Sequence, residues 1–221
     1  MTLAHKLLDE ENPSQTIILG AGFVGSAAAR FLESEGARCL SIRRKDLDLL
    51  SDGADEKLAS LINKSSTLVI VSALAPVKNY KMLHENLRML EPIVNVLSEI
   101  KPAHIVYVSS DAVYKDSSNP LSENSCAEPS SLHGVMHLTR EIVLREIAGD
   151  IPLAIVRPSL IYGLADPHNG YGPNRFYRDA CNAQDIQLFG EGEELRDHVY
   201  IDDVGELISR VVRRRSEGVL N

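Results

Sequence analysis

A glycine-rich turn near the start of the chain constrains its fold more than any other feature. Residues 17–25 read IILGAGFVG, a short apolar run that ends in Gly20-x-Gly22-x-x-Gly25. Helical periodicity follows directly, over Phe23–Glu33. Between a strand and a helix, these glycines permit a sharp turn, close approach of a pyrophosphate and close helix–strand packing. The pattern indicates a dinucleotide-binding unit with the pyrophosphate at the helix N-terminus.

Beyond this turn, apolar runs and helical segments alternate. The predicted strands are Arg38–Ile42, Thr67–Ala73, Ala103–Ser109, Leu153–Val156 and Ile186–Phe189. The predicted helices are Ala54–Ile62, Asn79–Ile100 with a kink at Pro92, Ser130–Ile147, Arg175–Ala183 and Asp202–Arg213, and Gly163–Pro173 is a predicted loop. Apolar runs without polar alternation are typical of strands buried on both faces. The order therefore predicts an α/β fold, a doubly wound parallel sheet of Rossmann type.

Composition excludes several classes of function. The net charge of −8 argues against nucleic acid or anionic lipid as the main partner. No segment resembles a membrane span or a signal peptide. The cysteines Cys39, Cys126 and Cys181 are scattered, which is typical of reduced residues. We therefore expect a cytoplasmic protein that binds a small molecule.

Three later segments carry a family resemblance. Val108–Tyr114 (VSSDAVY) is similar to SS-x-x-VYG, and Arg157–Gly163 (RPSLIYG) to RP-x-x-x-YG. Phe189–Val204 is similar to G-x-G-x-x-x-RD-x-V-x-VDDV. With the glycine turn, these segments resemble the extended short-chain dehydrogenases/reductases, the family of NAD(P)-dependent nucleotide-sugar epimerases and dehydratases. The resemblance runs from about Thr16 to Asn221. It implies a Rossmann domain over residues 1–162 and, over 163–221, a partial substrate lobe interleaved with the last Rossmann elements.

The resemblance also implies cofactor contacts in the loops that follow the strands. The residues concerned are Gly20, Gly22, Phe23, Val24, Gly25, Ala73 and Asp48, the last at the position of an aspartate that contacts adenine. After the second strand NAD-specific relatives carry an acidic residue, whereas this chain has Arg43 and Arg44. A basic cluster suits a 2′-phosphate, so NADP is favoured over NAD, with a solvated loop as the alternative.

The Tyr-x-x-x-Lys pair of the family is missing. Its register reads His133-Gly134-Val135-Met136-His137 in this chain. A histidine titrates near neutral pH and can exchange protons without a lysine to activate it. One turn apart, the two imidazoles disfavour each other's protonation. We expect His133 to accept the proton and His137 to hydrogen-bond the nicotinamide ribose.

Three other interpretations of the histidines stay open. In the first, the histidines are remnants in a domain that binds nucleotide without catalysis. In the second, they are metal ligands together with Glu141, and in the third they are ordinary, partly buried helix residues. Catalysis is favoured because the register matches that of the family, and no metal site is predicted.

Four further residues complete the predicted site. Ser110 matches a serine or threonine that orients the reacting oxygen, with a turn cap as the alternative. Asp111 stands where dehydratases carry an acid, although Ala112 replaces their glutamate. Arg196 and Asn174 match residues that bind the substrate diphosphate and sugar, with a surface salt bridge and a helix cap as alternatives.

The sequence ends at Gly218–Asn221, which resembles a strand after which relatives continue through their substrate lobe. We expect a lobe that is truncated relative to the family, in a chain that is either naturally short or incomplete. The favoured function is an NADP(H)-dependent epimerase or oxidoreductase acting on a nucleotide-sugar-like substrate. The alternative is a non-catalytic NAD(P)-binding or redox-sensing protein of the same fold. The resemblance also implies a homodimer through Asn79–Ile100 and Ser130–Ile147, the two long helices by which family members often dimerise.

Overall fold

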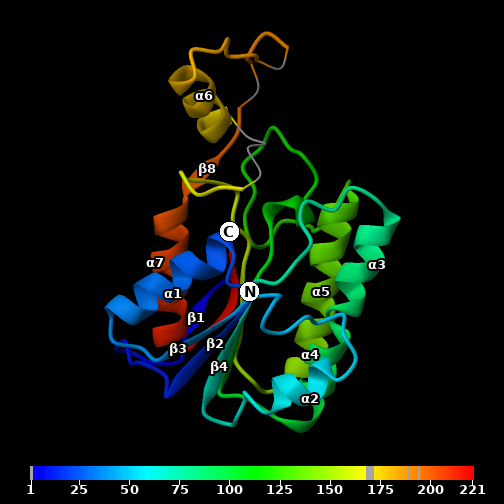
Figure 1. The fold of residues 1–221 in the computed structure, drawn as a ribbon, viewed down its shortest axis with the longest axis vertical. Coiled ribbons are helices and arrows are strands. Elements are labelled where there is room, and N and C mark those ends of the chain that lie inside the picture. The colour runs from blue at the N-terminus through cyan, green and yellow to red at the C-terminus, as the bar shows by residue number, and fades with distance from the viewer. Residues whose placement is uncertain (1, 168–171, 189, 194) are drawn as a thin grey trace.

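A seven-stranded sheet forms the centre of the computed structural model, which describes residues 2–167, 172–188, 190–193 and 195–221 (Figure 1). The strands of this sheet are β1 (Ala4–His5), β2 (Gln15–Leu19), β3 (Cys39–Ile42), β4 (Ser66–Ile70), β5 (His104–Val108), β6 (Leu153–Val156) and β9 (Ser216–Leu220). The strands β7 (Leu160–Tyr162) and β8 (His198–Tyr200) lie outside it. The helices are α1 (Phe23–Ser34), α2 (Ala54–Ala59), α3 (Tyr80–Arg88), α4 (Glu91–Glu99), α5 (Leu132–Ala148), α6 (Gly172–Cys181), α7 (Ile201–Arg213) and the 3₁₀ turn η1 (Asp111–Val113).

The sheet order is β1-β9-β6-β5-β4-β2-β3, and every neighbouring pair is parallel except β1 with β9. Helices cover both faces: α1 and α7 pack together on one, and α2 to α5 lie on the other (Figure 1). Strand side chains alternate between the faces, so Ile17 and Leu19 enter one apolar core while Ile18 enters the other. The doubly wound α/β fold is confirmed.

The chain changes direction across the sheet at β2. From β2 it crosses through α1 to β3 on one side, and then through α2 back to β4 on the other. At such a switch point the loops that follow two neighbouring strands run apart and leave a crevice beyond the carboxyl ends. The loops after β2 and β4 therefore border the place where this fold binds its ligands.

The predicted helix Asn79–Ile100 is wrong as a single element. The helix α3 ends at Arg88 and α4 begins at Glu91, with Pro92 in its first turn. The first N–H groups of a helix have no partner within it, so a proline is tolerated there. Pro92 therefore starts a new helix instead of kinking the preceding one.

The segment after β6 differs most from the prediction. The strand predicted at Ile186–Phe189 is wrong over its described part, since residues 184–188 have no regular structure, and Phe189 lies outside the described residues. The predicted loop Gly163–Pro173 holds for residues 163–167, residues 168–171 lie outside the described residues, and α6 already begins at Gly172. Two unpredicted strands, β7 and β8, form a small parallel pair. Further along, α7 covers the central sheet and β9 extends it beside β6.

The structure also bears on membrane spans and on the cysteines. Among the described helices, none is long and apolar enough to cross a membrane. All three cysteines are free thiols, and Cys39, the one that is half-buried, has its pKa raised by burial to about 11.

Candidate active site

A cleft of about 650 Å³ lies beyond the carboxyl ends of β2, β4 and β5. It brings together segments that are far apart in the sequence. Its lining includes Gly20, Gly22, Phe23 and Val24 of the first turn, Ser72 and Ala73 after β4, Ser110 and Asp111 after β5, His133 and His137 of α5, and Arg196. Most of the predicted cofactor residues and all four predicted catalytic residues thus share one cleft.

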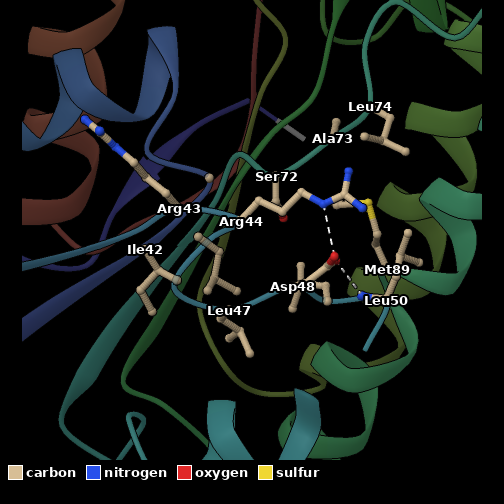
Figure 2. Close-up of a pocket in the computed structure, with 13 residues that line it drawn as sticks. Ile42, Arg43, Arg44, Leu47, Asp48, Leu50, Ser72, Ala73, Leu74 and Met89 are labelled. Carbon is tan, nitrogen blue, oxygen red and sulfur yellow. Dashed lines mark hydrogen bonds and ion pairs between the residues drawn. The ribbon is translucent and has the colours of Figure 1, made fainter. Parts of the chain in front are cut away.

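A smaller cavity of about 130 Å³ adjoins this cleft at Gly20, Ser72 and Ala73, which line both hollows. Figure 2 shows this cavity. Its walls are mostly apolar and come from Ile42, Leu47, Leu49, Leu50, Leu74 and Met89, with Arg43, Arg44 and Asp48 beside them. An apolar hollow with a few polar groups is the usual form of a ligand pocket. The two hollows therefore adjoin each other beyond the carboxyl ends of β2 and β4.

The two arginines after β3 lie differently. Arg44 extends along the small cavity, and its Nε lies 3.0 Å from the Asp48 carboxylate, whereas Arg43 points away from the cavity (Figure 2). Asp48 also accepts the Leu50 N–H, and this bond, followed by the one from Arg44, lowers the pKa of its carboxyl. The guanidinium of Arg43 is exposed and has no side-chain partner within the described part of the chain. Of the pair, Arg43 is therefore the one available to a ligand phosphate.

The glycine turn fits a bound pyrophosphate. Gly20 has a φ of +96°, and a Cβ there would lie 2.5 Å from the Ser72 nitrogen. At Gly25 a Cβ would lie 2.3 Å from the Gly20 carbonyl oxygen, so this glycine permits α1 to pack on the turn. A Cβ on Gly22, by contrast, meets nothing within 4 Å. Gly20 and Gly25 thus shape the turn, and Gly22 leaves open space at the N-terminus of α1.

Ser110 and Asp111 form a hydrogen-bonded pair at the end of β5. The Ser110 hydroxyl accepts the Ala112 N–H at 3.1 Å and donates to Asp111 Oδ1 at 3.1 Å. Ser110 therefore caps η1 and lines the cleft at the same time. Burial raises the pKa of Asp111, opposed by its hydrogen bonds to Ser110 and Ala112 and by the charge of Arg196. The protonated form of the Asp111 carboxyl is favoured relative to a carboxyl in water.

The two histidines form a packed pair on α5. Their ring centroids lie 4.7 Å apart in an edge-to-face arrangement. Burial lowers the pKa of His133, and its buried Nδ1 has no hydrogen-bond partner within the described part of the chain. For His137, burial and the nearby His133 and Arg140 hold the pKa well below 6.5. Both imidazoles are therefore neutral at neutral pH.

Glu141, which the metal-ligand alternative requires, already has hydrogen-bond partners inside the protein. Its carboxylate accepts two bonds from Arg157, at 2.6 and 2.9 Å, and one from Ser109 at 2.7 Å. Glu141 is fully buried in this network. Among the described residues, no group of three or more metal-binding side chains is close enough to hold an ion.

The two predicted substrate residues differ in their surroundings. Arg196 lines the cleft, with Nη1 3.7 Å from the Asp116 carboxylate. Asn174 is buried, and its amide accepts the Gly163 N–H at 3.0 Å and donates to Asp166 at 2.7 Å. These bonds hold the turn after β7, so the contact of Asn174 with a substrate stays a prediction.

Several residues of the site were not predicted. Ser72 and Lys115 line the cleft, and Tyr107 and Arg140 lie behind the histidines. Ser72 was included in the predicted strand Thr67–Ala73, but β4 ends at Ile70, so Ser72 lies in the loop that follows it. Lys115 follows the VSSDAVY segment, where the family pattern has glycine.

Comparison with known proteins shows the family to which the chain belongs. Residues 16–221 match the model of the NAD dependent epimerase/dehydratase family. The chain belongs to this family.

It is 27% identical to the uncharacterized UDP-glucose epimerase YtcB of Bacillus subtilis over 165 residues, which cover 70% of this chain and 51% of YtcB. It is 26% identical to the UDP-glucose 4-epimerase of Mycolicibacterium smegmatis, over 89% of this chain and 72% of that protein. The chain therefore spans about half the length of the first of these relatives.

Solved structures share the fold. MoeE5 in complex with UDP-glucose and NAD superposes with a TM-score of 0.76 at 21% identity, over 94% of this chain and 75% of MoeE5. The ADP-L-glycero-D-manno-heptose-6-epimerase of Helicobacter pylori gives a TM-score of 0.78 at 22% identity, over 97% of this chain and 78% of that enzyme. At this identity the likeness establishes the architecture.

Proposed function

We propose that the protein is an NADP(H)-dependent epimerase or oxidoreductase that acts on a nucleotide-sugar-like substrate, with His133 as its proton acceptor. One observation carries this proposal: a single cleft joins the glycine turn, Ser110 and the two histidines. The family supports nicotinamide chemistry, and two relatives are named as UDP-glucose epimerases. We therefore take UDP-glucose as the first substrate to test.

Each residue has a proposed role that follows from its chemistry. The turn at Gly22 and the N-terminus of α1 bind the pyrophosphate, because free N–H groups there attract an anion. Bound nicotinamide supplies the hydride acceptor. Ser110 hydrogen-bonds the substrate hydroxyl, and the neutral imidazole of His133 takes its proton. Arg196 binds the substrate diphosphate through its planar guanidinium.

NADP is the proposed cofactor because Arg43 and Arg44 follow β3, and the exposed guanidinium of Arg43, directed away from the small cavity, has no side-chain partner within the described part of the chain. Isothermal titration with NADP⁺ and NAD⁺ tests this preference. We expect tighter binding of NADP⁺ in the wild type, and Arg43→Asp to lose that preference while NAD⁺ affinity changes little. The substitution Lys64→Asp, at an exposed cation elsewhere, is the control. Equal wild-type affinities for the two nucleotides would reject the proposal.

Turnover tests the catalytic role. Inversion of UDP-glucose and other nucleotide sugars is followed by proton NMR in the presence of NADP⁺. We expect His133→Ala to abolish turnover with NADP⁺ affinity nearly intact, while His84→Ala, at an exposed histidine of α3, changes neither. Turnover that survives His133→Ala would remove this residue from the chemistry. His133→Tyr combined with His137→Lys tests whether the family pair restores activity.

A non-catalytic nucleotide-binding or redox-sensing protein is the second candidate. It is favoured by the burial of His137, whose Nδ1 is already bonded to Tyr107. Such a protein binds NADP(H) but turns over no nucleotide sugar in any variant. We also propose a homodimer through α3 and α5.

A further inference from the structure

His137 is supported from behind by two side chains that take no part in the proposed chemistry. The hydroxyl of Tyr107, on β5, lies 2.8 Å from His137 Nδ1. Arg140, one turn further along α5, is fully buried, and its guanidinium carbon lies 5.5 Å from the centroid of the Tyr107 ring. Its Nη1 donates to the Ser72 carbonyl at 2.8 Å. His137 and Ser72 line the cleft, so Tyr107 and Arg140 form the layer directly behind its wall.

The contact with Tyr107 determines which nitrogen of His137 carries the proton. A buried phenol needs an acceptor for its O–H, and burial raises the pKa of Tyr107 to about 12, so it keeps its proton. Within the described part of the chain, His137 Nδ1 is the hydrogen-bond partner of that hydroxyl. Nδ1 must then present its lone pair, and in a neutral ring the proton resides on Nε2.

Arg140 adds a fixed positive charge. Its Nε and Nη2 are buried and have no hydrogen-bond partner within the described part of the chain. Arginine does not lose its proton in proteins, so this charge persists at every working pH. A cationic His137 would face this guanidinium and would also have to donate from Nδ1, which would leave the Tyr107 hydroxyl without an acceptor.

His133, whose ring centroid lies 4.7 Å from that of His137, also disfavours the cationic ring, and the carboxylates near His137 do not offset these effects. Glu141 is committed to Arg157 and Arg145. Asp111 belongs to η1, which packs against α5, and its carboxylate is hydrogen-bonded to Ser110. On the helices that pack against α5, the titratable side chains are exposed or half-buried: Tyr80, Lys81, His84, Glu85 and Arg88 of α3, and Glu91 and Glu99 of α4.

We propose that Tyr107 and Arg140 are positioning residues that hold His137 as a neutral hydrogen-bond donor: the phenol fixes the Nε2–H tautomer, and the buried guanidinium opposes protonation of the ring. Nε2–H is then the group that His137 offers to an acceptor in the cleft. The inference rests on the proposed function only in naming that acceptor, an oxygen of a bound nicotinamide nucleotide.

Histidine ring ¹⁵N NMR of the ligand-free protein tests the proposal without any activity. In the wild type we expect His137, assigned with His137→Gln, to carry its proton on Nε2 and to be neutral at pH 6.5, where an ordinary imidazole is half-protonated. Tyr107→Phe removes the donor and should give a mixture of the two tautomers. Arg140→Met should raise the pKa of His137, and Arg140→Lys should restore the low value. Arg145→Met removes an exposed cation of the same helix and should change neither property.

The two proposals fail separately. A wild-type His137 that carries its proton on Nδ1, or that titrates near pH 6.5, overturns this inference whether or not the protein turns over a nucleotide sugar. If both Arg140 variants unfold, the wild-type spectrum and Tyr107→Phe still decide. Titration with NADP⁺ gives a second readout: Tyr107→Phe should weaken binding by about two- to tenfold, the loss expected for one impaired hydrogen bond. An unchanged affinity would contradict the role of His137 as a donor to the nucleotide.

Discussion

Two glycines of one motif have different physical roles. Gly20 combines a φ of +96° with a Cβ position 2.5 Å from the Ser72 backbone, so any side chain there disturbs the fold. Gly22 faces open space at the N-terminus of α1. The first residue is therefore required by the backbone, whereas the second has no such requirement and leaves room for the proposed pyrophosphate.

This difference predicts the result of a matched pair of substitutions. Gly22→Val should leave the circular dichroism spectrum unchanged and abolish NADP⁺ binding, because the new side chain fills the proposed pyrophosphate space. Gly20→Val should lower the melting temperature. Titration calorimetry and thermal melts measure both. Wild-type affinity in a folded Gly22→Val protein would mean that this turn does not hold the nucleotide.

The pKa of His133 makes a prediction about pH. Burial lowers that pKa, and only the neutral ring accepts a proton from a substrate hydroxyl. The oxidative half-reaction should thus be flat from neutral pH upward and should fall in acid, below the ordinary histidine value of about 6.5. Rates measured across pH with bound NADP⁺ check this. An acid limb that persists unchanged in His133→Gln would assign the proton to another group, with Asp111 the first to test.

Residues that stand in short sequence motifs could be predicted to lie at one cleft, whereas residues brought together only by the fold could not. The glycine turn, Ser110 and the histidine pair lie in short segments that can be compared with the motifs of the family position by position. Tyr107 and His137, by contrast, are 30 positions apart, and Arg140 and Ser72 are 68 apart. No periodicity in the sequence links residues across such distances, because the sheet and α5 bring them together only after folding.

At the scale of elements, burial decided which strands could be recognised. The central strands β4 and β5 are fully buried, so their apolar runs are unbroken. The strands β7 and β8 have three residues each and are half-buried or exposed, so they lack both length and pattern. The break between α3 and α4 was missed because their joint sequence keeps its helical character through Met89 and Leu90.

The close approach of α5 to η1 depends on Gly134. A Cβ at this position would lie 1.9 Å from the Ala112 carbonyl oxygen, which is backbone and cannot move aside alone. Gly134→Ala should separate α5 from η1, cost about 1–3 kcal/mol of unfolding free energy and reduce turnover by moving His133 away from Ser110. Glu146→Ala, at an exposed site of the same helix, should stay within about 0.5 kcal/mol. Urea denaturation compares the two. Equal stabilities would mean that the helix adjusts without strain.

At the scale of the whole molecule, one face of α5 exposes apolar side chains to solvent in the monomer. On α5, Leu132, Val135 and Ile142 are 39%, 37% and 57% exposed, although the opposite face of the helix is buried. Tyr80, on the neighbouring α3, is 75% exposed. Single exposed apolar residues are normal on any protein surface. These residues, by contrast, lie on two helices that pack side by side, and grouped exposed apolar residues are typical of an interaction surface.

This face predicts a homodimer in solution. Covering it with the same face of a second copy would bury the apolar residues of both chains around a two-fold axis. Sedimentation velocity at micromolar concentration should therefore find a dimer. The double substitution Val135→Glu and Ile142→Glu should convert it to a folded monomer, because charges buried without partners oppose association. Leu8→Glu, at a residue that is 95% exposed and distant in sequence from both helices, is the matched control and should leave the dimer intact. A monomeric wild-type protein would reject the dimer, and a dimer that survives the double substitution would move its interface away from α5.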